Sequence, residues 1–86
     1  MKADRVLDAR GWGFPWCCLK SMSMLRALES GQILKVLCTD PLTLEDLPRI
    51  LGRTDNHLIG VEMEPGYFRL YLRRGPAAEG DCNGGK

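Results

Sequence analysis

Hydrophobic and polar positions along the chain follow two different periods, which predict strands and helices in alternation. Residues 5–9 form a short first strand, and residues 33–39 are a nearly all-apolar run typical of an interior strand. Residues 57–64 and 67–73 alternate between apolar and polar positions, with turn residues between them. We therefore expect four strands, the last two paired as a hairpin whose inward side chains are Ile59, Val61, Met63, Phe68, Leu70 and Leu72.

Two segments between these strands carry the spacing and the end signals of helices. The first begins at Pro15, which suits the first helical position, and its apolar side contains Cys18, Met22, Leu25 and Leu28. The second covers residues 43–52 and begins with a capping box formed by Thr43 and Asp46. Pro48 removes a backbone hydrogen bond one turn into this second helix, so we expect the helix to be short or distorted.

The order of these elements, βαβαββ, favours one architecture. A right-handed crossover through the first helix makes the first two strands parallel. Both helices need an apolar surface to pack on, which predicts an α/β (α+β) two-layer sandwich with a four-stranded mixed sheet and two helices on one face. We assign residues 1–75 to this domain. Residues 76–86 are rich in glycine and contain no large apolar residue, so we expect them to form a flexible tail.

Length, hydropathy and charge exclude several classes of protein. A chain of 86 residues allows one small domain. No apolar run approaches the ~18–20 residues that span a bilayer, and no apolar stretch of a secretory signal follows the N-terminus. We therefore expect a cytoplasmic protein without membrane contact. The formal net charge of +1 gives no overall field that would attract nucleic acid or an anionic membrane.

The four cysteines fit neither a disulfide framework nor a zinc site. Cys17 and Cys18 are adjacent, Cys38 lies far from both, and Cys82 is in the glycine-rich tail. Zinc templates need paired spacings of cysteine and histidine, and the chain has one histidine, His57. We therefore expect free thiols in a reducing compartment, with no metal and no cofactor.

Four segments, read together, give a family resemblance. They are residues 7–11 (LDARG) followed by Pro15, residues 31–41 (GQILKVLCTDP), residues 46–48 (DLP) and residues 67–75 (YFRLYLRRG). Together they resemble the TusA/SirA family of small sulfur-carrier proteins. The resemblance implies the βαβαββ fold and a role in sulfur relay. In such a relay a cysteine accepts a persulfide sulfur from a donor protein, of the desulfurase or rhodanese type, and passes it to a downstream acceptor protein.

The chain departs from this family at the position that carries the sulfur. The family signature at the start of the first helix is Cys-Pro-x-Pro, and the corresponding residues here are Phe14, Pro15, Trp16 and Cys17. Phe14 replaces the sulfur-carrying cysteine, and Cys17 replaces the second proline. The family's acceptor residue therefore has no counterpart in this sequence.

Cys17 is the best remaining candidate for a sulfur acceptor. It lies in the first turn of the expected helix, where free backbone amides and the helix dipole favour a thiolate. The alternative is that Cys17 only replaces a proline with another small residue. Cys18 lies on the apolar side of the helix and Cys38 has the inward parity of its strand, so we expect both to be core residues. They remain candidate secondary thiols, and Cys38 could resolve Cys17 if the first two strands are parallel neighbours.

Three of the six aromatic residues, Trp12, Phe14 and Trp16, lie within five positions of one another. A loop that also contains Pro15 cannot easily bury all three, so we interpret the four residues as a partner-binding patch. The alternative is that one or two of the rings cap the edge of the sheet.

The open face of the predicted sheet mixes basic and aromatic side chains, namely Lys35, Arg69, Tyr71 and Arg73. Such a face could stack on RNA, but Glu62 and Glu64 lie nearby and neutralise it, so we do not expect nucleic acid binding. Two hypotheses remain ahead of this one. Either the chain is a TusA-like sulfur carrier that uses Cys17, or it is a non-catalytic interaction module that docks a partner through the aromatic residues.

Overall fold

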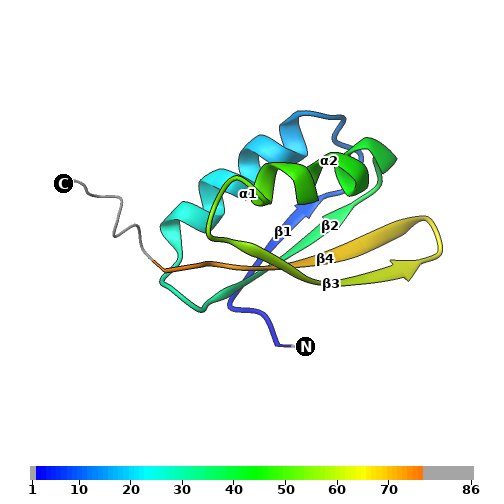
Figure 1. Ribbon diagram of the computed structural model, residues 1–86. Coiled ribbons are helices and arrows are strands. Elements are labelled where there is room, and N and C mark those ends of the chain that lie inside the picture. The colour runs from blue at the N-terminus through cyan, green and yellow to red at the C-terminus, as the bar shows by residue number, and fades with distance from the viewer. Residues whose placement is uncertain (1, 77–86) are drawn as a thin grey trace.

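Four strands and two helices alternate in residues 2–76, the part of the chain that the computed structural model describes. Their order is the expected βαβαββ, and both helices lie on one face of the sheet (Figure 1). The predicted two-layer sandwich is confirmed. The expected tail, residues 76–86, lies outside the described residues except for Pro76. The elements are β1 (Arg5–Ala9), α1 (Trp16–Ala27), β2 (Ile33–Cys38), α2 (Pro41–Leu51), β3 (His57–Glu64) and β4 (Tyr67–Arg73).

The strands form one mixed sheet in the order β1-β2-β4-β3. Strand β1 is parallel to β2, and β4 is antiparallel to both of its neighbours, β2 and β3. In the parallel pair Ala9 lies opposite Cys38, so the carboxyl ends of β1 and β2 meet at one edge of the sheet. The loops that lead into α1 and α2 therefore start side by side.

The core lies between the sheet and the two helices. Alternate residues of the central strands β2 and β4 point into it and are buried, while Leu25 of α1 and Leu47 of α2 cover them at 0% exposure. Burying a leucine side chain stabilises a fold by about 1.5–3 kcal/mol. Neither helix in the described residues is long and apolar enough to cross a membrane.

Helix α2 begins earlier than the capping box predicted. Asp40 is its N-cap residue, and its carboxylate accepts a hydrogen bond from the amide of Leu42 at 2.9 Å. Thr43 lies inside the helix and is buried. Asp40 is favoured as the cap because Pro41 follows it, and a proline at the first helical position loses no hydrogen bond. The helix continues through Pro48, which is exposed and has no N–H to donate to the carbonyl of Leu44.

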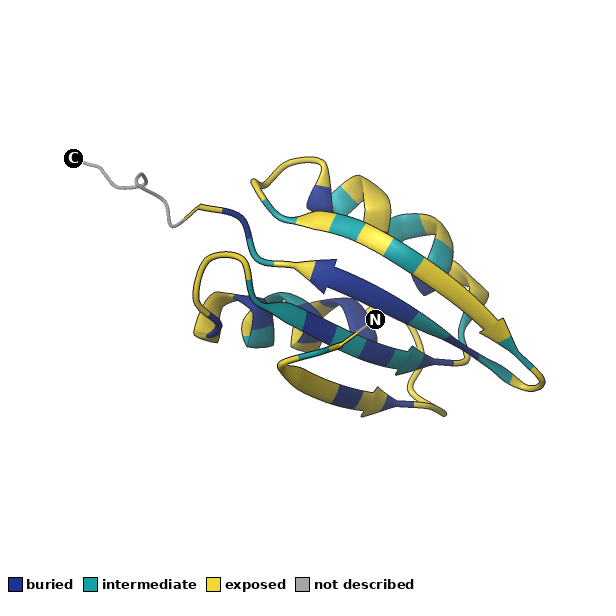
Figure 2. Ribbon diagram, turned by 90° about the horizontal axis from the view of Figure 1, so that it is seen from below, coloured by how far each residue is buried: buried dark blue, intermediate teal, exposed yellow. Residues whose placement is uncertain are grey.

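The burial expected for the apolar residues of β3 is wrong, although the register places Val61 and Met63 on the same face of the sheet as the core residues Leu70 and Phe68. Ile59, Val61 and Met63 are 36%, 42% and 67% exposed. A bulge between Leu58 and Gly60 shifts the register, so that Leu58 lies opposite Leu72 and packs against the core instead of Ile59. Beyond the bulge the strand runs along the edge of the sheet. Figure 2, seen from the open face, shows exposed positions along β3 and buried ones along the neighbouring β4.

The burial of α2 predicts unequal effects of two leucine substitutions in the same helix. Leu47→Ala should lower the free energy of unfolding by about 2–5 kcal/mol, because it leaves a cavity at a fully buried position. Leu42, which is 51% exposed, is the matched control, and its replacement by alanine should change stability by less than about 0.5 kcal/mol. Urea denaturation followed by circular dichroism measures both. Equal losses would mean that α2 does not pack on the sheet as described.

Candidate functional site

Three aromatic side chains are exposed on residues 10–16, which comprise the connection from β1 to α1 and the first residue of α1, Trp16, and which we name the aromatic loop. Trp12 is 39% exposed, Phe14 38% and Trp16 65%. Pro15 is the N-cap residue of α1 and is exposed as well. The structure therefore places all four residues of the expected partner-binding patch on one surface loop, and none of the three rings is buried in the fold.

Two hydrogen bonds hold the aromatic loop against the residues that follow β2. The amide of Gly11 donates to Thr39 Oγ1 at 2.8 Å, and the amide of Phe14 donates to Asp40 Oδ2 at 2.6 Å. Because the other carboxylate oxygen of Asp40 caps α2, this one side chain fixes both the loop and the start of the second helix. Gly11 has a φ of +85°, a conformation that glycine adopts without strain.

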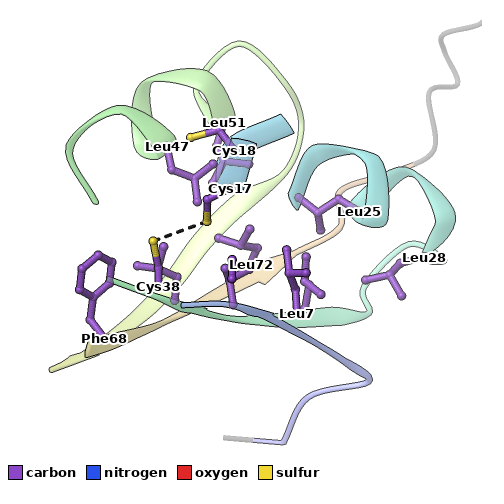
Figure 3. Packing of buried hydrophobic residues seen from close by; sticks show 14 residues of the cluster. Leu7, Cys17, Cys18, Leu25, Leu28, Cys38, Leu47, Leu51, Phe68 and Leu72 are labelled. Carbon is purple, nitrogen blue, oxygen red and sulfur yellow. Dashed lines mark hydrogen bonds between the residues drawn. The ribbon is translucent and has the colours of Figure 1, made fainter. Parts of the chain in front are cut away.

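Two thiols meet beneath this loop. Cys17 lies in the first turn of α1 and Cys38 is the last residue of β2, and the distance between their sulfur atoms is 3.5 Å (Figure 3). Cys17 donates this hydrogen bond and Cys38 accepts it. Both residues are 0% exposed. The parallel pairing of β1 with β2 brings them together, since it places the end of β2 next to the residues that begin α1.

The structure contradicts the lowered pKa expected for Cys17. Cys17 shares the buried side of α1 with Ser21 and Leu25, at a spacing of four residues, so it lies in the core and not beside it. The hydrogen bond with Cys38 and, next, burial raise the pKa of Cys17. The dipole of α1 does not overcome these two effects, because a thiolate without water is costly. Cys17 is therefore a protonated thiol at neutral pH.

The thiol of the pair that ionises more readily is Cys38. The hydrogen bond from Cys17 lowers the pKa of Cys38, against the opposing effect of its burial. Backbone groups of Asp40 and Thr39 and the hydroxyl of Thr43 also lower this pKa, while the Cys38 thiol itself donates to the carbonyl of Asp40 at 3.9 Å. These groups belong to the start of α2, whose amino-terminal end favours negative charge.

Two buried hydroxyl groups lie among the thiols. Ser21 acts to lower the pKa of Cys17, and Thr43 acts on Cys18 and Cys38. Both side chains are 0% exposed, and neither hydroxyl oxygen has a hydrogen-bond partner among the described residues. The third thiol, Cys18, is 1% exposed and points away from the pair on the α2 side (Figure 3), where burial raises its pKa. Within residues 2–76 no group of three or more cysteine, histidine or acidic residues could hold a metal ion.

A shallow groove adjoins the aromatic loop. Its volume is about 220 Å³. Phe14 forms one side of the groove. The other side is formed by residues of α2 and of the turn after it, namely Asp46, Arg49, Ile50 and Arg53. The surface around Phe14 thus combines apolar side chains with two guanidinium groups. This is the mixed composition that protein-binding patches use, since aromatic and arginine residues dominate the binding energy of interfaces.

On the open face of the sheet, Arg69 is neutralised by the two glutamates that the sequence indicated. Arg69 forms ion pairs with Glu62, at 2.9 Å, and with Glu64. The hydroxyl of Tyr71 donates to Glu62 at 3.0 Å, and Tyr71 is only 3% exposed. A ring that is buried in this way offers no face on which a base could stack. The hypothesis of RNA binding by this face therefore receives no support from the geometry.

Comparisons with known proteins agree on one family. The profile of the family described as "Sulfurtransferase TusA" matches residues 5–74. A sulfur carrier protein TusA of Allochromatium vinosum is 34% identical over 71 residues, which cover 83% of this chain and 93% of that protein. A putative sulfur carrier protein of Bacillus subtilis is 33% identical over 75 residues, which cover 87% of this chain and 40% of that protein.

A solved structure supports the architecture independently. The crystal structure of a SirA-like protein from Desulfitobacterium hafniense superposes with a TM-score of 0.66 and covers 83% of this chain and 97% of its own. At 19% sequence identity this likeness concerns the fold alone. Since the family profile extends from β1 to the residue after β4, the chain belongs to the TusA family.

Proposed function

We propose that this chain is a TusA-like sulfur carrier in which Cys17 accepts the sulfur. The observation that carries the proposal is the position of Cys17: its thiol lies beneath the aromatic loop, next to the exposed Trp16 and in contact with a second thiol. A donor protein of the desulfurase or rhodanese type would dock on the aromatic loop. A downstream acceptor protein would then take the sulfur, in the reducing cytoplasm.

Loading of Cys17 requires that the aromatic loop opens, because the thiol is 0% exposed. The loop is held by the hydrogen bonds to Thr39 and Asp40, and its aromatic side chains already face outward. A hydrogen bond contributes about 0.5–1.5 kcal/mol, or about 1.5–3 kcal/mol when one partner is charged, so opening costs a few kcal/mol. A docked donor can supply this energy by binding Trp12, Phe14 and Trp16 in the open form.

Opening also changes the chemistry of the thiol. Burial and the hydrogen bond to Cys38 both raise the pKa of Cys17, and both effects are lost when the loop moves away. The thiolate of Cys17 would then attack the outer sulfur of the donor's persulfide. A new bond forms between Cys17 and that sulfur, the donor's sulfur–sulfur bond breaks, and the donor cysteine leaves as a thiolate.

A second candidate function, an interaction module that passes no sulfur, is favoured by a different observation. The exposed side chain at the signature position is Phe14, and every cysteine in residues 2–76 is buried. The groove beside Phe14 could still hold a partner. The two candidates use the same surface and differ in whether sulfur reaches Cys17.

Sulfur loading separates the two candidates. In a Cys82→Ser background, a desulfurase supplied with cysteine should add one sulfur to Cys17, because docking opens the loop over this thiol. Intact mass and peptide mass measure the product. Cys17→Ser should abolish this added sulfur.

Phe14→Cys is the positive control, since it places an exposed thiol at the family's own position. Loading of Phe14→Cys without loading of the parent chain would reject the carrier and leave the interaction module.

Weakening the attachment of the loop should expose Cys17. Thr39→Val removes the hydrogen bond to Gly11 and should raise the rate of Cys17 alkylation by iodoacetamide about fivefold, which corresponds to about 1 kcal/mol of opening free energy. Thr54→Val is the matched control, because this exposed threonine also bonds the backbone, at the opposite end of α2. Equal acceleration by the two variants would show that Cys17 reacts through general unfolding.

The aromatic loop should also dominate donor binding. Trp16→Ala should weaken binding of the desulfurase at least tenfold in a titration calorimeter, because tryptophans at interface centres contribute about 2 kcal/mol or more. Val6, which is 53% exposed on the open face of the sheet, provides the control, and Val6→Ala should bind as the parent does. Unchanged affinity of Trp16→Ala would show that the desulfurase docks on another part of the surface.

A further inference from the structure

The two sulfur atoms beneath the aromatic loop are close enough to become one bond. They are 3.5 Å apart, and a disulfide measures about 2.05 Å, so closing the gap needs a movement of about 1.5 Å. The two cysteines belong to different elements, the first turn of α1 and the last position of β2. A disulfide between Cys17 and Cys38 therefore avoids the strain of a disulfide between the adjacent residues Cys17 and Cys18.

We propose that Cys38 discharges the sulfur held by Cys17 as sulfide, and that the two cysteines close to a disulfide in this step. The inference rests on the proposed function in one respect, that Cys17 receives the sulfur. It adds a product, sulfide, and a second cysteine with a defined part in the reaction. The chain would then deliver sulfur either as a persulfide to a protein or as free sulfide.

The step balances in atoms and electrons. The thiolate of Cys38 attacks the inner sulfur of the Cys17 persulfide, and a bond forms between the two cysteine sulfurs. The bond between the inner and outer sulfur breaks, and the outer sulfur leaves with the electron pair as hydrosulfide. The outer sulfur is reduced by two electrons, and the two cysteine sulfurs are oxidised. A dithiol reductant then restores both thiols and is itself oxidised to a disulfide.

The surroundings assign the attacking role to Cys38. It accepts the hydrogen bond of the pair, and this bond lowers its pKa, so it is the sulfur that carries negative charge first. Cys18 follows Cys17 directly in the chain, but its side chain points toward α2, and burial raises its pKa. A thiol that remains protonated is a poor nucleophile.

The buried hydroxyl groups fit the charge that moves in this step. Ser21 and Thr43 are fully buried beside the thiols, and neither has a hydrogen-bond partner among the residues described. Leaving a hydroxyl unpaired in a core costs about 1–3 kcal/mol, so such groups call for an explanation. An extra sulfur between Cys17 and Cys38 would give both hydroxyls an acceptor, and its negative charge would be stabilised as it leaves.

The disulfide would also close the site. It joins the start of α1 to the end of β2, directly before Thr39 and Asp40, which hold the aromatic loop. A chain that has discharged its sulfur would therefore keep the loop shut. It could be loaded again only after reduction.

A single-turnover experiment tests the proposal. A desulfurase that carries one persulfide, freed of cysteine by gel filtration, is mixed with the full chain in the Cys82→Ser background. We expect one equivalent of sulfide, a loss of two hydrogens in intact mass and a Cys17–Cys38 peptide pair. A dithiol reductant should restore the reduced mass and permit a second turnover.

Cys38→Ser should instead retain the persulfide on Cys17 and release no sulfide. Cys38→Ala serves if the buried serine hydroxyl prevents folding, and Cys18→Ser should behave as the parent.

The outcomes distinguish this inference from the proposed function. A stable persulfide on Cys17 of the parent chain, with no disulfide, would overturn the inference and leave the carrier intact. A disulfide between Cys17 and Cys18 would also overturn it. Absence of sulfur on Cys17 in both the parent and Cys38→Ser would overturn the inference and the proposed function together.

Discussion

The parallel pairing of β1 with β2 is the interaction on which the site depends. Because the two strands run in the same direction, Ala9 lies opposite Cys38, and both helices start from the same edge of the sheet. An antiparallel pair would place the two loops at opposite ends of the sheet. The hydrogen bond from the aromatic loop to Asp40, the cap of α2 and the meeting of Cys17 with Cys38 all follow from this arrangement.

Burial both protects the thiols and limits them. A buried cysteine behaves as a small hydrophobic residue, and three of them, Cys17, Cys18 and Cys38, are part of the hydrophobic core. The same burial raises the pKa of Cys17, which keeps the thiol inert while the aromatic loop is closed. In the proposed carrier, the reactivity of Cys17 would therefore depend on the free energy of opening the loop, which a partner can change, and not on the intrinsic pKa of an exposed thiol.

The sequence predicted the order of elements, the parallel pair and the central strands, because apolar periodicity and turn residues determine these locally. It did not predict features that depend on neighbours. Because of the bulge before Gly60, Leu58 packs against the core in place of Ile59. The alternation of apolar and polar residues in β3 does not reveal this bulge. The buried side of α1 contains Cys17 and the polar Ser21, which the expected apolar side of this helix did not include. The sequence contains two signals for the start of α2, an aspartate followed by a proline at residues 40–41 and the capping box at Thr43. The structure uses the first, whereas the capping box led us to predict the second.

The phenylalanine at the signature position separates two tasks that one exposed cysteine would combine. Phe14 is 38% exposed and borders a groove with Arg49 and Arg53, so in the proposed carrier the outer surface of the loop would bind the partner and take no part in the chemistry. The thiols lie behind it, where water and small oxidants have little access, and a persulfide formed there is shielded from both. Docking and chemistry are then coupled only through the movement of the loop. In the proposed carrier, the hydrogen bonds at Thr39 and Asp40 would set the energy of that coupling, since they would have to break before sulfur reaches Cys17. A carrier built in this way would admit sulfur only from a partner that binds the aromatic loop strongly enough to open it.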